Sequence, residues 1–138
     1  MTDCLFCKFI SGELPCDKIY EDEHTLAFLD IHPLNEGHTL VIPKTHAVNL
    51  LDISSTDFTH VMSTVHALTP IIKDVTGAEG MNIHSNHGKV AGQAVFHLHM
   101  HIIPRHTGDG YQHWHRNESI PTHLKETQAK ILALLSMK

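Results

Sequence analysis

The stretch from residue 92 to residue 105, GQAVFHLHMHIIPR, alternates three histidines with large apolar residues and constrains the fold most strongly. Successive side chains of a β-strand point to opposite faces, so this alternation predicts a strand that is apolar on one side only. The apolar face consists of Ala94, Phe96, Leu98, Met100 and Ile102, and the polar face of Gln93, His97, His99 and His101. Neighbouring imidazoles would stand roughly 6–7 Å apart, because each strand residue rises about 3.3 Å.

A chain of 138 residues, of which 41% are hydrophobic and 18% charged, is expected to form one globular domain, residues 1–138. Its formal net charge of −5 argues against a general nucleic-acid surface, which would need an excess of Lys and Arg. No apolar run approaches the length of a membrane span, and the N-terminus lacks a basic region followed by an apolar signal core. We therefore expect a cytoplasmic protein without nucleic-acid or membrane partners.

Besides the histidine strand, short apolar runs bounded by turn residues predict four strands: 18–20, 25–30, 38–42 and 80–86. A long helix from Ser54 or Ser55 to Val75 is predicted by apolar residues at helical spacing: Phe58, Val61, Met62, Val65, Leu68, Ile72 and Val75. Pro70 predicts a kink or an early end near Leu68. A shorter helix with Leu124, Ile131, Leu132 and Leu135 finishes the chain.

Five strands and two helices indicate an α+β domain with an antiparallel sheet. We expect the helices on one face of this sheet and the histidines on the open face. Three interpretations of the histidine row then compete. The rings are solvated surface residues, or two of them bind a metal ion, or one imidazole is a nucleophile that its neighbours orient.

Two of the three cysteines form the pair Cys4-Leu-Phe-Cys7 near the N-terminus. In a reducing compartment such a pair indicates a metal site or a redox pair rather than a structural disulfide. Cys16 is left over, and we expect it to be an ordinary thiol.

The segment His97-Leu-His99-Met-His101-Ile-Ile103 resembles the signature of the histidine triad, or HIT, family. The resemblance extends to other segments in the order and approximate spacing of the Hint branch: Asp30-Ile31, Gly37-His38, Pro43-Lys44, His46, Asn86 and Gly92-Gln93. It covers residues 3 to about 105, which would form the core of a HIT domain. Residues 106–138 would form a more divergent C-terminal extension with the terminal helix.

The resemblance implies a covalent mechanism without a catalytic cofactor. By position, His99 is the nucleophile that attacks the α-phosphate of a purine nucleotide and forms a nucleotidyl-histidine, which water then cleaves. His101 would donate to the phosphate oxygens. His38 would be a partner of the histidine row that does not itself contact the substrate. His97 completes the triad.

The resemblance also implies how the nucleotide is bound. Asn86 and Gln93 would donate amide N–H groups to the phosphate, whereas Ala94, where the family often has serine, offers only its backbone N–H. Asp30 would accept from the ribose hydroxyls. The apolar walls of the base pocket would be Leu5, Phe6, Phe9, Phe28 and Ile31.

A structural zinc ion is implied as well, bound by Cys4, Cys7 and the equivalents of two family ligands, His46 and His97. In that arrangement His97 orders the strand by binding the metal ion and takes no part in the reaction. The resemblance further implies a homodimer.

The expected function is hydrolysis of purine nucleoside phosphoramidates or related adenylated compounds at the α-phosphate. Sister branches of the family with the same triad act as dinucleoside polyphosphate hydrolases or nucleotidyl transferases. Outside catalysis, the alternatives are a nucleotide-binding adaptor and a metal-handling protein that uses its fifteen histidines.

Overall fold

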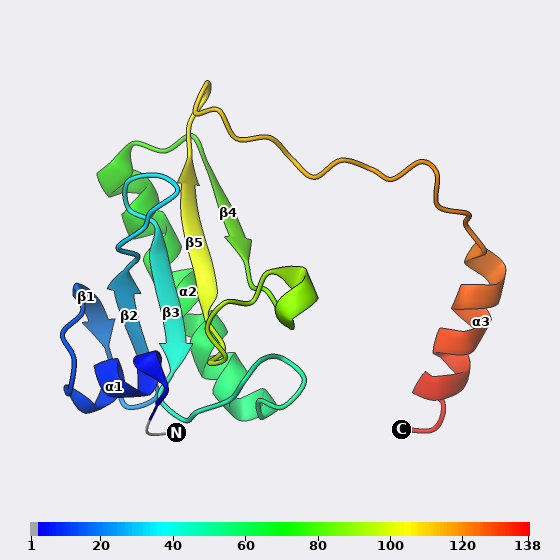
Figure 1. Ribbon diagram of the computed structural model, residues 1–138, viewed down its shortest axis with the longest axis horizontal. Coiled ribbons are helices and arrows are strands. Elements are labelled where there is room, and N and C mark those ends of the chain that lie inside the picture. Colours follow the sequence, from blue (N-terminus) through cyan, green and yellow to red (C-terminus); the bar gives the residue numbers. More distant parts are fainter. Residues whose placement is uncertain (1–2) are drawn as a thin grey trace.

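The computed structural model describes residues 3–138 and contains a five-stranded antiparallel sheet in the order β1-β2-β3-β5-β4 (Figure 1). The strands are β1 (Lys18–Glu21), β2 (Thr25–Leu29), β3 (Thr39–Pro43), β4 (Gly80–His84) and β5 (Met100–Arg105). The helices are α1 (Leu5–Ser11), α2 (Ser55–Thr76), α3 (Leu124–Leu135) and a short 3-10 helix, η1 (Lys89–Ala91). The predicted α+β class with five antiparallel strands is confirmed, and α1 is a helix that the sequence analysis did not expect.

Helix α2 covers one face of the sheet and forms the larger core with it. This core consists of Ala27, Val41, Val61, Val65, Leu68, Ile72, Leu98, Met100 and Ile102. The helix starts where predicted, because the Ser54 side chain accepts a hydrogen bond of 3.1 Å from the N–H of Asp57. A buried hydrogen bond of 2.8 Å between the hydroxyls of Thr25 and Thr64 joins β2 to α2.

Pro70 does not end α2. The helix continues to Thr76, so the predicted early end near Leu68 is wrong. Pro70 faces solvent, where water can satisfy the carbonyl that lost its N–H partner, and buried Leu68 and Ile72 hold the helix on the sheet on either side of it. Val75, which we expected on the apolar stripe, is exposed.

The second face of the sheet is also covered, by α1. Phe6 packs with its ring centroid 5.4 Å from that of Phe28, in a second core of Phe6, Leu26, Phe28, Leu40 and Ile42. The side chain of Cys4 caps α1 by accepting from the N–H of Cys7. As expected, the predicted long helix α2 lies on one face of the sheet and the histidines lie on the other. Helix α1, which was not predicted, partly covers the histidine face.

The strand that carries the histidines begins later than predicted. β5 starts at Met100, whereas residues 93–99 are irregular. Its pairing with β3 stops at Val41, opposite Met100, and β3 itself ends at Pro43, which has no N–H for a further ladder bond. The carbonyl of Pro43 instead lies 2.9 Å from the ring Nε2 of His97.

Because β5 starts late, only part of the apolar face that alternation predicted is buried. Leu98, Met100 and Ile102 are buried against α2, as expected. Ala94 lies in the irregular segment and lines a cavity instead, and Phe96 is half exposed. Alternation therefore marks the buried part of the face correctly but overestimates the length of the strand.

The C-terminal arm, residues 106–138, leaves the domain (Figure 1). Its first residues are fixed, because Arg105 pairs with Asp109 at 2.7 Å and the hydroxyl of Tyr111 donates to the carbonyl of Leu34 at 2.8 Å. The chain then runs to α3, which stands apart from the sheet with every residue exposed. In the described part of the chain, no helix combines the length and hydropathy that crossing a bilayer requires.

Candidate active site and metal centre

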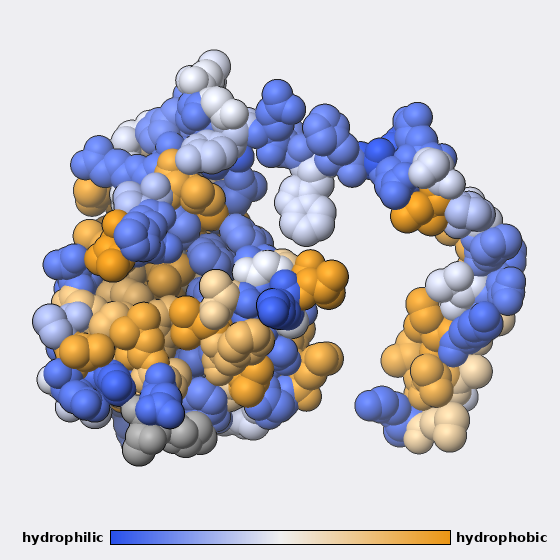
Figure 2. All heavy atoms as spheres, in the orientation of Figure 1, coloured by the Kyte–Doolittle hydropathy of each residue, from blue (hydrophilic) through white to orange (hydrophobic). Residues whose placement is uncertain are grey.

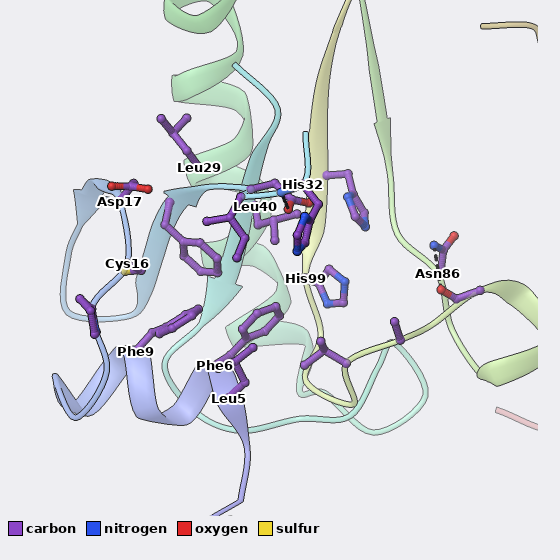
Figure 3. A pocket seen from close by; sticks show the side chains of 18 residues that line it. Leu5, Phe6, Phe9, Cys16, Asp17, Leu29, His32, Leu40, Asn86 and His99 are labelled. Carbon is purple, nitrogen blue, oxygen red and sulfur yellow. Dashed lines mark hydrogen bonds between the residues drawn. The ribbon is translucent and has the colours of Figure 1, made fainter. Parts of the chain in front are cut away.

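A cavity of about 610 Å³ opens between α1, the loop after β2 and the start of β5 (Figure 3). All five apolar residues expected around a base line it: Leu5, Phe6, Phe9, Phe28 and Ile31. Its polar lining includes Asp30, Asn86, His99 and His101. Cys16, His32 and Leu40 also line this cavity, and they were not predicted because only the fold brings them to its wall.

His99 presents a lone pair at the cavity wall. Its Nδ1 lies 2.8 Å from the backbone carbonyl oxygen of His97. A carbonyl oxygen only accepts, so Nδ1 carries the proton and Nε2 of the neutral ring is free to attack. The ring is buried against the edge of Phe6, with 5.1 Å between the ring centroids. This arrangement provides what nucleophilic catalysis by an imidazole requires.

A chain of hydrogen bonds fixes the proton on His101. The N–H of Leu34 donates to Nδ1 of His38 at 3.1 Å, so neutral His38 carries its proton on Nε2. That Nε2 lies 2.9 Å from Nδ1 of His101 and donates to it, which leaves the proton of His101 on its own Nε2. Within residues 3–138 this buried atom has no hydrogen-bond partner. It is a donor that lacks an acceptor beside the nucleophile.

Burial keeps these rings neutral at pH 7. It lowers the pKa of His101 to about 3, with a smaller contribution from His99. Burial likewise lowers the pKa of His99 and of His38 below the ordinary histidine value. A neutral His99 retains its lone pair, and a neutral His101 retains the proton that the hydrogen-bond chain assigns to Nε2.

Asn86 and Ala94 lie at the cavity beside the turn at Gly92. Gly92 has a φ of 95°, a left-handed conformation that favours glycine, and a Cβ there would lie 3.4 Å from the Asn86 amide nitrogen. The glycine therefore lets this turn approach the Asn86 side chain closely. Both the amide of Asn86 and the backbone at Ala94 are positioned at the same wall as His99.

Gln93 does not line the cavity. Its side chain is only 3% exposed. Its amide nitrogen donates to the carbonyls of Val48 at 2.6 Å and Val95 at 3.2 Å, and its oxygen accepts from the N–H of Gly88 at 2.8 Å and from Asn49 at 3.4 Å. With these four bonds made, the amide has no free donor for a phosphate, and in this structure it joins two loops instead.

Asp30 lies where the cavity meets the hydrogen-bonded histidines. Its Oδ1 accepts from the N–H of His32 at 2.9 Å, and its Oδ2 lies 3.7 Å from Nε2 of His38. The carboxylate lines the cavity at the end of β2. It can therefore accept a hydrogen bond from a ligand hydroxyl on the side away from His38.

His84 is a fourth histidine beside the row. It is the partner of His101 in the pairing of β4 with β5, and the two rings stack with 4.6 Å between centroids and 10° between planes. The sequence analysis assigned His84 no role. The register of the two strands would have revealed the stack, but a single sequence does not give that register.

Cys4, Cys7, His46 and His97 form the second centre, and their ligand atoms all lie within 4.8 Å of one another. Nδ1 of His97 is 3.4 Å from Sγ of Cys4, 3.6 Å from Sγ of Cys7 and 3.1 Å from Nδ1 of His46. Zinc bonds of about 2.0–2.3 Å would give a tetrahedron with edges of about 3.3–3.8 Å. The spacing of these ligand atoms therefore fits a four-coordinate metal ion.

The protonation of this group suits a cation too. The ring Nε2 of His97 donates to the carbonyl of Pro43, so its Nδ1 offers a lone pair to the other ligands. Burial and then the neighbouring Cys4 raise the pKa of Cys7 to about 11, whereas a bound cation would stabilise the thiolate. Asp30, His38 and His101 are also grouped closely enough to hold an ion. There, however, the facing nitrogens of the two histidines bond to each other.

The HIT domain model matches residues 11–108, well over half of the chain. The Bacillus subtilis protein named Protein hit is 48% identical over 110 residues, which cover 79% of this chain and 76% of that protein. An adenosine 5′-monophosphoramidase of Schizosaccharomyces pombe is 42% identical over 105 residues, 74% of each chain. An adenylylsulfatase of Arabidopsis thaliana is 44% identical over 108 residues, 78% of this chain and 55% of that protein.

Solved structures that resemble this chain also belong to HIT family proteins. A HIT family protein of Bacillus anthracis, 36% identical, matches with a TM-score of 0.89 over 99% of this chain and 97% of its own. A Streptococcus mutans protein, 37% identical, matches with a TM-score of 0.88 over 100% of this chain and 87% of its own. A zinc-bound histidine triad protein of Mycobacterium smegmatis, 36% identical, has a TM-score of 0.77 and covers 99% of both chains. The chain belongs to the HIT family.

Proposed function

We propose that this protein is a purine nucleotide hydrolase that cleaves at the α-phosphate through a covalent intermediate on His99. The Nε2 lone pair of His99 attacks phosphorus, and the bond from phosphorus to the leaving group breaks. Water then attacks the nucleotidyl-histidine and releases the nucleotide, which restores the imidazole. Splitting one displacement into two steps lowers the barrier of each. The observation that carries the proposal is the fixed tautomer of His99, set by the 2.8 Å contact with the carbonyl of His97.

His101 complements this nucleophile. Its unpartnered Nε2–H donates to a phosphoryl oxygen, where negative charge increases in the transition state. Asn86 and the backbone N–H of Ala94 donate from the adjoining wall. Because alanine has no hydroxyl, this wall offers the leaving group less hydrogen bonding than a serine would, and nucleotides whose leaving group departs readily are preferred.

The nucleoside occupies the rest of the cavity. Asp30 accepts from the ribose hydroxyls, and the purine lies among the apolar side chains contributed by α1 and β2. Relatives named adenosine 5′-monophosphoramidase and adenylylsulfatase favour adenylated compounds with a nitrogen or sulfate leaving group. We therefore propose adenosine phosphoramidates as the substrate class to test first.

The ion proposed for the second centre is zinc, held by two thiolates and two imidazoles as a closed structural site. Bound there, it links α1, which walls the cavity, to the segment before β5. Four protein ligands leave no open position for substrate, so the ion takes no part in the reaction.

We also propose that the protein is a cytoplasmic homodimer. Edge strands β1 and β4 each present unpaired backbone groups, and pairing with a second copy is one way to protect such an edge. The absence of nucleic-acid and membrane partners stays a prediction from charge and hydropathy.

The test is to incubate the purified protein with an adenosine phosphoramidate and, separately, with a diadenosine polyphosphate, and to trap adenylate on the protein by rapid acid quench. Mass spectrometry should find the adenylyl group on His99 and faster turnover of the phosphoramidate. His99→Ala should retain nucleotide binding and lose at least about a thousandfold in kcat. Faster turnover of the polyphosphate would favour the sister-branch activity, and equal turnover by wild type and His99→Ala would leave a nucleotide-binding adaptor. Several bound metal ions per chain would favour a metal-handling protein.

A further inference from the structure

The end of the cavity that lies farthest from the nucleophile carries two polar side chains to which the proposed reaction gives no role. Figure 3 shows Asp17 and Cys16 at one end of the cavity and His99 at the other, with the rings of Phe6 and Phe9 between these ends. In Figure 2, hydrophobic atoms gather over α1 and β2, and hydrophilic residues surround them. The cavity is therefore polar at both ends and apolar in its middle.

The pairing of the strands fixes the distance between these two ends. One residue from each of four strands belongs to a row of backbone partners across the sheet: Lys18, Phe28, Leu40 and His101. Neighbouring strands are about 4.8 Å apart, so the row extends over roughly 14 Å from β1 to β5. Asp17 directly precedes the first member of this row, and its carbonyl accepts a hydrogen bond of 3.0 Å from the N–H of Leu29. Asp17 is therefore held beside β2, three strand spacings from the histidines of β5.

A nucleotide bound as proposed above extends along this row, so the inference that follows rests on the proposed function. Its phosphate lies at His99 and its ribose at Asp30. The purine is bonded to the ribose through N9 and lies over Phe28. Its Watson–Crick edge, which is on the opposite side of the base from N9, then points towards β1 and Asp17.

The carboxylate of Asp17 is available to a ligand. Within residues 3–138 its oxygens have no hydrogen-bond or ion-pair partner, and the ammonium of the adjacent Lys18 pairs with Glu21 at 3.1 Å instead. Of the residues that the structure describes, no lysine or arginine lines the cavity. Burial raises the pKa of the neighbouring Cys16 thiol, so this side chain is uncharged at pH 7. Because an ionised carboxylate only accepts hydrogen bonds, this end of the cavity favours a base that presents N–H donors.

We infer that Asp17 selects the base of the nucleotide and favours guanine over adenine. Guanine presents two adjacent donors, N1–H and its amino group, which match the two oxygens of one carboxylate. Adenine presents one donor, its amino group, beside the lone pair of N1, which the carboxylate repels. Bidentate hydrogen bonds to a charged group are the stronger kind, whereas the apolar walls hold both purines equally well. Adenosine compounds remain substrates and are turned over less efficiently than guanosine compounds.

The first test compares kcat/KM for the 5′-phosphoramidates of guanosine, adenosine and inosine. Inosine keeps N1–H but lacks the amino group of guanine. Wild type should prefer the guanosine compound about tenfold over each of the others, a moderate factor because Asp17 is exposed and water competes for it. Asp17→Ala should reduce this preference to about twofold or less. Glu13→Ala is the matched control, because it removes a negative charge from the same loop at a side chain that does not line the cavity. Both side chains lie outside the two cores, so both variants should fold.

Binding measurements separate a failure of this inference from a failure of the proposed reaction. In calorimetry with His99→Ala protein, the Kd of GMP should be lower than that of AMP by about the same factor, tenfold. Bound GMP should also slow the alkylation of Cys16 by N-ethylmaleimide, located by peptide mass spectrometry, whereas ribose 5-phosphate, which has no base, should not.

The outcomes are distinct. If no phosphoramidate is cleaved but GMP is preferred and Asp17→Ala removes the preference, only the proposed reaction fails. Equal constants for the guanosine and adenosine compounds would overturn the inference while the reaction stands, and so would a preference that Asp17→Ala retains. Failure of both GMP and AMP to bind would overturn both.

Discussion

Nε2 of His38 lies 2.9 Å from Nδ1 of His101, and this contact decides which nitrogen of His101 carries the proton. His38 can donate because its other nitrogen is already occupied by the N–H of Leu34. The position of the proton on His101 is thus set, through His38, by the backbone N–H of Leu34. We therefore propose that His38 acts through His101 as a positioning residue.

Replacing His38 tests this role. His38→Phe removes the donor, so His101 can place its proton on either nitrogen, and kcat should fall by about 10–100-fold with little change in KM. His38→Gln keeps an N–H donor and should recover part of the loss. Steady-state kinetics on an adenosine phosphoramidate provide the measurement. Equal losses in both variants would mean that the ring packs without directing the proton.

Substitution of Gln93 should affect mainly stability, whereas substitution of Asn86 should affect mainly ligand binding. Gln93→Ala leaves buried groups of Val48 and Gly88 unpaired and should lower the free energy of unfolding by about 3 kcal/mol, as measured by urea denaturation. Asn86→Ala, at the cavity wall, should leave stability nearly unchanged and raise KM. If Gln93→Ala raised KM at unchanged stability, Gln93 would turn to the phosphate when substrate binds.

Acid should destabilise the fold through its buried histidines. His101 has a pKa of about 3 in the fold, against 6.5 for an unperturbed histidine, so between these values the unfolded chain binds a proton that the folded chain does not. The free energy of unfolding therefore falls as pH falls below about 6.5, by about 1.4 kcal/mol per pH unit for one such residue.

His101→Phe removes this contribution. Between pH 6 and pH 4 its free energy of unfolding should depend on pH less steeply than that of the wild type, by about 1.4 kcal/mol per pH unit. Urea unfolding is measured with a chelator present, so that metal release contributes to neither curve. Identical slopes would show that His101 takes up its proton without unfolding.

Metal removal should weaken the N-terminal half of the domain. We expect one zinc ion per chain, and its removal by a chelator should lower the free energy of unfolding by roughly 3 kcal/mol or more. Cys4→Ser should lose the ion, whereas Cys16→Ser, whose thiol lies at the cavity, should keep it. Metal analysis and thermal unfolding of both variants test this. A fully stable, metal-free wild-type protein would contradict the proposed site.

The strands and α2 could be predicted because their evidence is local. Alternation and helical spacing report which side chains are buried, and Ser54 marks the start of α2 directly. Helix α1 was not predicted, because it has only seven residues and its cap is the thiol of Cys4, a residue that sequence reasoning assigns to metal. The late start of β5 was not predicted, because it depends on the position of Pro43 in the neighbouring strand β3.

The site could be predicted only as a set of positions. Resemblance to the HIT family supplied His99, Asp30 and the apolar lining, which the fold brings to one cavity. The tautomers could not be predicted, because they depend on a carbonyl and an amide that lie close to the rings only after folding. The same holds for Gln93, whose amide looks free in the sequence and is fully occupied in the fold.

His97 belongs to both centres at once, with its ring in one and its main chain in the other. The imidazole faces the thiols, and the carbonyl of the same residue holds the ring of His99. A rotation of this one residue would loosen a metal ligand and misalign the attacking nitrogen together. A metal ion bound by the thiols would, on the proposed mechanism, therefore also hold the attacking nitrogen of His99 in line.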